Sequence, residues 1–344
     1  MDPLADPIDL VALTRALVDI DSTTGREGEV GRWLADYLRR IGLTVTEQPV
    51  DAARFNIIAV PQGDAEPVVV FSTHVDCVPP FFPSRVEGDR LYGRGSCDAK
   101  GILAAQVAAA DRLRRDGEAR VGLVFVVGEE RGSDGARKAN EAANGSQFLI
   151  DGEPTDNRLG LATRGILRVR LRARGRAAHS SFPELGESAI DKLIDALVEL
   201  RSIALPTDSV LGRTHYTVGL IGGGVAPNVV SPSADAEVMF RTVSDADAVR
   251  RAIAPLERRV DIEHIIDVPP VRLKTVGGFD TAVFPYTTDI PFLSKWGEPL
   301  LFGPGSIHAA HTADEFVSIA ELGAAADHYV TIARELLARQ PPKL

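Results

Sequence analysis

The sequence is poor in cysteine and has no long apolar segment. Its two cysteines, Cys77 and Cys97, cannot form the disulfide framework of a small secreted domain, and we interpret both as small buried residues. No apolar run approaches the roughly 20 residues of a membrane-spanning helix. Residues 1–6 lack the basic and apolar regions of a secretory signal. We therefore expect a cytoplasmic protein without a membrane partner.

The sequence also lacks an excess of positive charge. It has 38 Lys and Arg residues against 48 Asp and Glu residues, which gives a net charge of -10. Because nucleic-acid binding depends on a basic surface, we expect no nucleic-acid partner. The chain of 344 residues is long for a single hydrophobic core, so two domains are expected.

Two motifs of other protein classes are missing as well. The glycine-rich loop at residues 93–101 does not have the Gly-x-x-x-x-Gly-Lys-Ser/Thr order of a phosphate-binding loop. The Gly-x-Ser-x-Gly element of many serine hydrolases does not occur in the chain. These absences argue against a nucleotide-binding protein and against a serine hydrolase.

The sequence does contain short apolar runs that end at metal-binding residue types. The runs are residues 68–71, 124–127 and 148–150. The acidic or imidazole side chains that follow them are His74, Asp76, Glu129, Glu130 and Glu153. Such runs are typical of buried parallel strands, and open α/β sheets bind ligands beyond the carboxyl ends of their strands. With Asp98 of the glycine-rich loop and the distant His311, these side chains provide enough ligands for two metal ions.

Hydrophobic periodicity predicts an α/β domain at both ends of the chain. Apolar residues at 3.6-residue spacing predict a helix that ends at Gly42, and the Ala- and Leu-rich residues 101–115 predict the helix of a β-α-β crossover. A mixed, mostly parallel sheet flanked by helices follows from this alternation. A final helix is expected near the C-terminus, with a capping box of Thr312 and Glu315 at its start.

The middle of the chain has a different pattern. Residues 167–172 alternate between apolar side chains and arginine, which is the period of a sheet with one solvated face. The predicted elements that follow are helices at residues 190–200 and 246–259 and strands near residues 216–221, 236–240 and 262–268. They complete a β-α-β-β-α-β order, which indicates an inserted ferredoxin-like α+β domain. The predicted boundaries are residues 1–163 for the first catalytic part, 164–271 for the insertion and 272–344 for the second catalytic part.

Five motifs in order resemble those of the M20 family of metallopeptidases and deacylases, which includes acetylornithine deacetylase and succinyl-diaminopimelate desuccinylase. The motifs are His74-Val75-Asp76, the loop at residues 93–101, Gly128-Glu129-Glu130, residues 152–155 and Ala310-His311-Thr312. The resemblance extends over nearly the whole chain. It implies a zinc exopeptidase-like catalytic domain with an inserted lid or dimerisation domain.

The resemblance also implies a centre of two zinc ions, with cobalt or manganese as alternatives for the same nitrogen and oxygen ligands. Asp98 would bridge the ions, because two ions about 3.5 to 4 Å apart need a shared ligand. The remaining ligands would be His74 and Glu153 for the first ion and Glu130 and His311 for the second. His308 is an alternative to His311, but only His311 directly precedes the predicted final helix.

Two further residues would serve this centre. Asp76 would accept the second imidazole N–H of His74 and fix its tautomer. Glu129 precedes Glu130 on a segment that we expect to be extended, so the two side chains would point in opposite directions. Glu129 would then be free to act as general base.

The inserted domain would complete the site. By resemblance, His179 would reach the active site of the other subunit in a homodimer formed through residues 164–271 and donate to the developing oxyanion. The residues expected to contact the substrate are Asn228, Arg241 and Gly305. Arg241 would bind a substrate carboxylate, although residues 239–241 read Met-Phe-Arg where the family more often has Asp-x-Arg.

The predicted reaction is removal of the N-acyl group from an N-acyl amino acid, with Glu129 as general base for a metal-activated water. Glu153 favours a deacylase over an aminopeptidase, since by resemblance deacylases and carboxypeptidases carry Glu at this position and aminopeptidases carry Asp. A dipeptidase or carboxypeptidase acting on short peptides is the alternative enzyme. A catalytically silent binding protein on the same fold is the non-enzyme alternative, although the chain keeps every metal and base residue.

Overall fold

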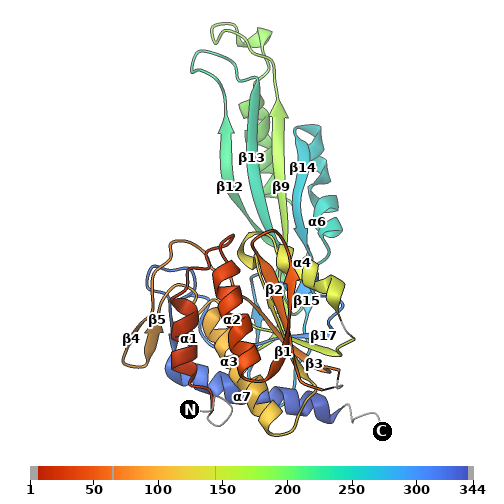
Figure 1. The fold of residues 1–344 in the computed structure, drawn as a ribbon. Helices are drawn as coiled ribbons and strands as arrows, with labels where there is room; N and C mark the ends of the chain where they lie inside the picture. Colours follow the sequence, from red (N-terminus) through yellow and green to blue (C-terminus); the bar gives the residue numbers. More distant parts are fainter. Residues whose placement is uncertain (1–6, 64–65, 144, 340–344) are drawn as a thin grey trace. The chain divides into compact units, whose positions relative to one another are not determined.

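The computed structural model divides the chain into two compact units (Figure 1). The residues that it describes are 7–63, 66–143 and 145–339. Unit 1 comprises Met1–Leu161, Leu273–Ala282 and Thr288–Leu344, and unit 2 comprises Ala162–Arg272 and Val283–Thr287. The residues predicted as an insertion, 164–271, all belong to unit 2. Residues 1–6, the basis for expecting no secretory signal, lie outside the described residues.

Unit 1 contains a six-stranded, mostly parallel sheet. In sheet order its strands are β1 (Leu43–Pro49), β2 (Phe55–Pro61), β6 (Val121–Val126), β3 (Val69–His74), β7 (Phe148–Asp151) and β17 (Glu298–Leu301). The last four are parallel, whereas β1 and β2 pair antiparallel. Every side chain of β3, β6 and β7 is buried, as expected for apolar strands covered on both faces. The predicted mixed sheet is confirmed.

Helices cover both faces of this sheet. One face carries α1 (Leu10–Val18), α2 (Gly28–Arg40), α3 (Lys100–Arg115) and α7 (Ile319–Ala338). Their apolar sides form the main core with alternate side chains of β3, Val69 and Phe71. On the other face, α4 (Asp134–Ala139) and Trp296 pack against Val70 of the same strand. Among the helices of the described residues, none is both long and apolar enough to cross a membrane.

Short strands form two further sheets. Strands β4 (Arg85–Glu87), β5 (Arg90–Tyr92) and β18 (Phe316–Ser318) form a three-stranded sheet. A second such sheet consists of β8 (Leu159–Thr163), β15 (Val271–Arg272) and β16 (Thr281–Phe284). Single 3-10 turns are η1 (Glu129–Arg131), η2 (Asn140–Ala142) and η5 (Ile290–Phe292). Of these elements, η1, β5 and β18 lie next to the candidate site in the sequence.

Unit 2 is a four-stranded antiparallel sheet with two helices on one face. In sheet order its strands are β12 (His215–Gly223), β13 (Ser233–Thr242), β9 (Gly165–Arg174) and β14 (Asp261–Val268). Its helices are α5 (Ala189–Leu200) and α6 (Ala246–Ile253), and its shortest elements are η3 (Pro183–Leu185), β10 (Thr207–Asp208) and β11 (Gly212–Arg213). The apolar side chains of β9 pack under the helices, and its arginines alternate to the other face, where Arg170 contacts Glu237 at 2.5 Å. The predicted β-α-β-β-α-β order is confirmed.

The second helix of unit 2 is shorter than predicted. We expected one helix over residues 246–259, but the α-helix ends at Ile253 and the chain continues as the 3-10 helix η4 (Ala254–Arg258). Pro255 explains the change, because it has no N–H to donate to the preceding turn of an α-helix.

The final helix begins later than predicted, and the capping box of Thr312 and Glu315 is wrong. The first helical residue is Ile319. Ser318 is its N-cap, and the Ser318 hydroxyl oxygen accepts the N–H of Glu321 at 3.1 Å. The intervening residues pair with β5 as strand β18, so they are not available for the helix.

Candidate metal centre

The carboxyl ends of β3, β6 and β7 carry the predicted site residues. These strands are parallel neighbours, so their carboxyl ends meet at one edge of the sheet. His74 is the last residue of β3, Glu129 and Glu130 follow β6, and Glu153 follows β7. Asp98 comes from the glycine-rich loop between β5 and α3. The structure thus brings together side chains from four separate segments.

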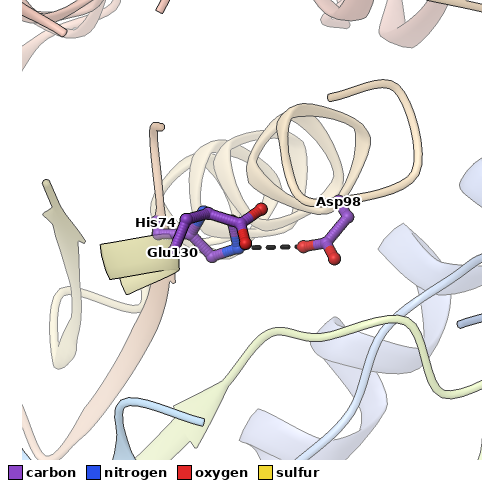
Figure 2. A group of neighbouring side chains, drawn as sticks. All are labelled: His74, Asp98 and Glu130. Atoms are coloured by element: carbon purple, nitrogen blue, oxygen red, sulfur yellow. Dashed lines mark hydrogen bonds and ion pairs between the residues drawn. The ribbon is translucent and has the colours of Figure 1, made fainter. Parts of the chain in front are cut away.

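His74 lies at this edge with both ring nitrogens in polar contacts, and its side chain is only 1% exposed. Nδ1 lies 2.9 Å from the backbone carbonyl oxygen of Asp76. Nε2 lies 2.9 Å from Oδ1 of Asp98 (Figure 2). Because a carbonyl oxygen can only accept, Nδ1 carries the proton of the neutral ring and Nε2 is free to bind a metal. We predicted this orienting role for the Asp76 carboxylate, but its Oδ1 is more distant, at 3.5 Å.

Asp98 directs its two carboxylate oxygens to different histidines. Oδ1 faces His74, and Oδ2 lies 3.3 Å from Nε2 of His311. The same His311 nitrogen lies 2.9 Å from Oε1 of Glu130. Two ligands on one tetrahedral zinc ion are about 3.3 Å apart, so these separations are close to those of ligands that share an ion. His74, Asp98 and Glu130 each offer one ligand atom, and these atoms lie within 4.8 Å of one another.

Glu129 and Glu130 lie on a 3-10 turn, η1, and our prediction of an extended segment is wrong. Because a 3-10 helix has about three residues per turn, consecutive side chains differ in direction by about 120°. The side chains of Glu129 and Glu130 therefore still diverge. The Asp76 carboxylate holds the turn in place. Its Oδ1 accepts the N–H of Glu129 at 3.1 Å, and its Oδ2 accepts the N–H of Glu130 at 3.3 Å. Oδ2 also accepts the hydroxyl of Thr24 at 2.8 Å.

The site concentrates carboxylates where little water reaches them. Burial, with the charges of Asp98 and Glu129, raises the pKa of Glu153 well above its usual range. Burial and the charge of Asp289 likewise raise the pKa of Glu129. Divalent cations would reverse both shifts, because a nearby positive charge stabilises an ionised carboxylate. The imidazole and carboxylate donors and the surplus of acidic groups therefore fit a metal centre.

Both histidines are strongly basic in these surroundings. Hydrogen bonds with Asp98 and Glu130 raise the pKa of His311 to about 10. Burial opposes protonation of His74, but the carboxylates of Asp76 and Asp98 beside its ring outweigh it and raise the pKa of His74 well above its usual value. Without metal ions, these shifts favour the doubly protonated, cationic form of both rings. Metal binding must therefore displace these protons.

Three of the predicted residues belong to unit 2, namely His179, Asn228 and Arg241. His179 and Asn228 are close to each other, since the N–H of Ser180 donates to the carbonyl oxygen of Asn228 at 3.0 Å. Arg241 is half-buried on β13, and burial lowers its pKa.

The loop that leads to His311 contains the other predicted residues. Gly305 has a φ of 80°, and a Cβ there would lie 2.6 Å from Sγ of Cys97, so both the backbone and the space favour glycine. Cys97 and Cys77 are buried and unbridged, as predicted. His311, and not the exposed His308, reaches Asp98, although our reason for preferring it was wrong because no helix follows it directly.

Two buried acids near the site escaped the sequence analysis. Asp151 ends β7 and is 2% exposed, and burial together with the charge of Asp289 raises its pKa. Asp289 is also 2% exposed, and burial raises its pKa to about 7. The position of Asp151 at the end of an apolar run was a usable signal. Asp289 lies in a segment without strand periodicity, so no comparable signal exists for it.

The chain is similar to known proteins over most of its length. Residues 70–335 match the family model described as Peptidase family M20/M25/M40. A peptidase M20 domain-containing protein of Schizosaccharomyces pombe is 39% identical over 91% of this chain and 81% of the relative. A probable carboxypeptidase of Aspergillus terreus is also 39% identical, over 92% of this chain and 83% of the relative.

A solved structure has the same fold. It is a dinuclear metal binding peptidase of the M20 family from Bacillus subtilis, with a TM-score of 0.75 and 16% identity. The likeness covers 96% of this chain and 97% of that chain. The family model and the two relatives show that the chain belongs to peptidase family M20/M25/M40, a family of hydrolases that act on amide bonds.

Proposed function

We propose that the chain is a two-metal hydrolase of carboxypeptidase type, which cleaves the amide bond next to a free carboxylate in a short peptide. The observation that carries this proposal is the Asp98 carboxylate, whose two oxygens face histidines from distant segments. The relative named as a probable carboxypeptidase supports the substrate class. The N-acyl amino acid deacylase predicted from the sequence is the second candidate, because Glu153 fits both activities and both substrates contain an amide beside a carboxylate.

The proposed ligands divide into two sets that share Asp98. His74 and Glu153 belong to the first ion, and Glu130 and His311 to the second. Bound ions would polarise the amide carbonyl and lower the pKa of a water molecule. Zinc suits this mixture of imidazole and carboxylate donors, and cobalt or manganese would also fit.

Glu129 is the proposed general base. The Asp76 carboxylate accepts the backbone N–H of Glu129. This contact fixes the backbone from which the Glu129 side chain extends, next to the proposed ligand Glu130. Burial and the charge of Asp289 raise the pKa of Glu129, while bound cations would act in the opposite direction. A carboxylate balanced in this way can accept a proton from water and deliver it to the leaving amine.

Arg241 is the proposed partner of the substrate carboxylate. Within the described part of the chain, no acidic side chain forms an ion pair with it, and its half-buried position lowers its pKa. A guanidinium group without an internal counter-ion can bind a carboxylate through two parallel hydrogen bonds. Such a contact would select substrates that have a free carboxylate beside the scissile amide.

We further propose that unit 2 forms a homodimer. Strand β12 lies at the edge of its sheet, and Leu220 and Ile221 on this strand are 65% and 64% exposed. Ile194 and Val198 on α5 are also largely exposed. An open strand edge with exposed apolar side chains favours association with a second copy. In this dimer, His179 of one subunit would act at the metal centre of the other and donate to the oxyanion.

Hydrolysis should require both a metal and a free substrate carboxylate. We expect the zinc-loaded protein to cleave dipeptides or N-acetyl and N-succinyl amino acids, and to cleave their C-terminal amides with a kcat/KM roughly 10- to 100-fold lower, the scale of a lost charged hydrogen bond. Arg241→Met should abolish this preference. Chelation should abolish the activity, and added zinc, cobalt or manganese should restore it. Full activity of the metal-free protein would contradict the proposal, and the preferred substrate distinguishes carboxypeptidase from deacylase.

Metal binding should release protons at neutral pH, because His74 and His311 are protonated in the metal-free site. We expect release of at least two protons per chain, one from each imidazole and in addition those that the raised pKa of the ligand Glu153 retains, measured by titration calorimetry in buffers of different ionisation enthalpy. The affinity should rise with pH up to about 10, as His311 loses its proton. His311→Ala should release about one proton fewer. A binding enthalpy that is independent of the buffer would contradict the assigned ligands.

Substitution of the adjacent glutamates should separate the base from the ligand. Glu129→Gln keeps the shape but removes the basic group, so we expect retained metal and a kcat lowered by at least about 100-fold. Glu130→Gln should instead weaken the second ion, and its activity should recover partly at high zinc because mass action refills a weakened site. Rescue of Glu129→Gln by zinc, together with a fully loaded but inactive Glu130→Gln, would require the two roles to be exchanged.

The dimer proposal predicts complementation between inactive variants. His179→Ala and Glu129→Ala should each be inactive alone, whereas a mixed dimer contains one site in which both residues are intact. We expect such mixtures to regain part of the activity, measured after heterodimers have been verified by differently tagged subunits. Verified heterodimers without activity would argue against a role of His179 across the interface.

A further inference from the structure

Glu315 is a completely buried acid that contacts the loop of the proposed bridging ligand, and its side chain is 0% exposed. Its Oε1 accepts the backbone N–H groups of Cys97 and Asp98, each at 3.1 Å. Its Oε2 accepts a hydrogen bond from Nη1 of Arg94 at 2.6 Å. One carboxylate therefore holds the backbone immediately at Asp98.

The backbone of Glu315 contacts the same loop. Its carbonyl oxygen accepts the N–H of Gly93 at 3.1 Å and the hydroxyl of Ser96 at 3.3 Å. The next residue, Phe316, begins β18 and pairs with Tyr92 at the end of β5. Glu315 thus lies where two paired strands separate into two loops, one leading to Asp98 and the other coming from His311.

Arg94 is itself fixed on several sides. It is 1% exposed, its Nε donates to the carbonyl oxygen of Pro80 at 3.1 Å, and its guanidinium carbon lies 5.0 Å from the centre of the Phe82 ring. Burying two opposite charges costs much of what their attraction provides, so such a pair is weak evidence of a contribution to stability. The many directional contacts of the Arg94–Glu315 pair are better explained by a role in positioning the neighbouring backbone than by a contribution to stability.

We propose that Glu315 is a positioning residue that sets the direction of both Asp98 oxygens. It fixes the backbone N–H groups of Cys97 and Asp98, and with them the backbone from which the Asp98 side chain extends. It also ties this backbone to the segment that carries His311, which lies four residues before Glu315. The inference rests on the proposed two-metal function. It adds that the bridge depends on a group that contacts neither ion.

The test is the metal affinity of folded variants. Glu315→Gln keeps an oxygen for the N–H groups but turns an amide toward Arg94, and Glu315→Ala removes every side-chain contact. We expect zinc to bind about 10- to 100-fold more weakly, the usual effect of losing a group that orients a metal ligand. Affinity is measured by chelator competition well below the melting temperature of each metal-free variant. Activity should recover partly at high zinc.

Asp111→Asn is the matched control. Asp111 is 2% exposed and pairs with Arg114 at 2.8 Å and Arg115 at 2.6 Å on the same helix that follows Asp98. It lies about 20 Å further along the chain at 1.5 Å per helical residue, so its loss should lower the melting temperature without changing zinc affinity.

The outcomes separate this inference from the proposed function. If Glu315→Gln folds and binds zinc as tightly as the unaltered protein, the positioning role is wrong, whether or not Glu315→Ala folds. If Asp111→Asn weakens zinc to the same extent, the effect is one of general destabilisation and the inference is equally overturned. If the unaltered protein binds no zinc, cobalt or manganese, the proposed function itself fails.

Discussion

The division of one carboxylate between two histidines is the constraint on which the rest of the centre depends. Oδ1 of Asp98 faces His74 on a strand end, and Oδ2 faces His311 on a loop more than two hundred residues later. Both contacts require that the sheet edge, the glycine-rich loop and the C-terminal segment meet at Asp98. The parallel register of β3 with β6 and β7 fixes the sheet edge. The pairing of β18 with β5 fixes the glycine-rich loop and the C-terminal segment.

The electrostatics of the centre are those of a site built for cations rather than for stability. Glu129, Glu153 and Asp289 all have raised pKa values because they are buried near one another. Folding these groups together without a counter-charge is unfavourable, since ionised carboxylates lose their hydration and repel. The protonated histidines offset only part of this charge. Metal ions would complete the neutralisation, which explains why so many acids occupy one sheet edge.

The sequence predicted the parts of the site that local patterns encode. Apolar runs located the strand ends, and the glycine-rich loop between them located Asp98. Both could be predicted because hydrophobic period and composition can be recognised within about ten residues of sequence. Contacts between segments far apart in the sequence could not be predicted from such local patterns. Glu315 fitted a capping box by its spacing from Thr312, yet it bonds to the N–H of Asp98, 217 residues away. The same limit hid Asp289, and the turn of Glu129 was mistaken for an extended segment because its geometry depends on Asp76.

The most direct test of this account is a crystal structure of the zinc-loaded protein with anomalous diffraction at the zinc edge. The account predicts two peaks per chain about 3.5 to 4 Å apart, each about 2.0 to 2.2 Å from a different oxygen of Asp98. His74 should coordinate one ion and His311 the other. A single peak, or two ions of which only one contacts Asp98, would contradict the shared carboxylate and with it the proposed mechanism.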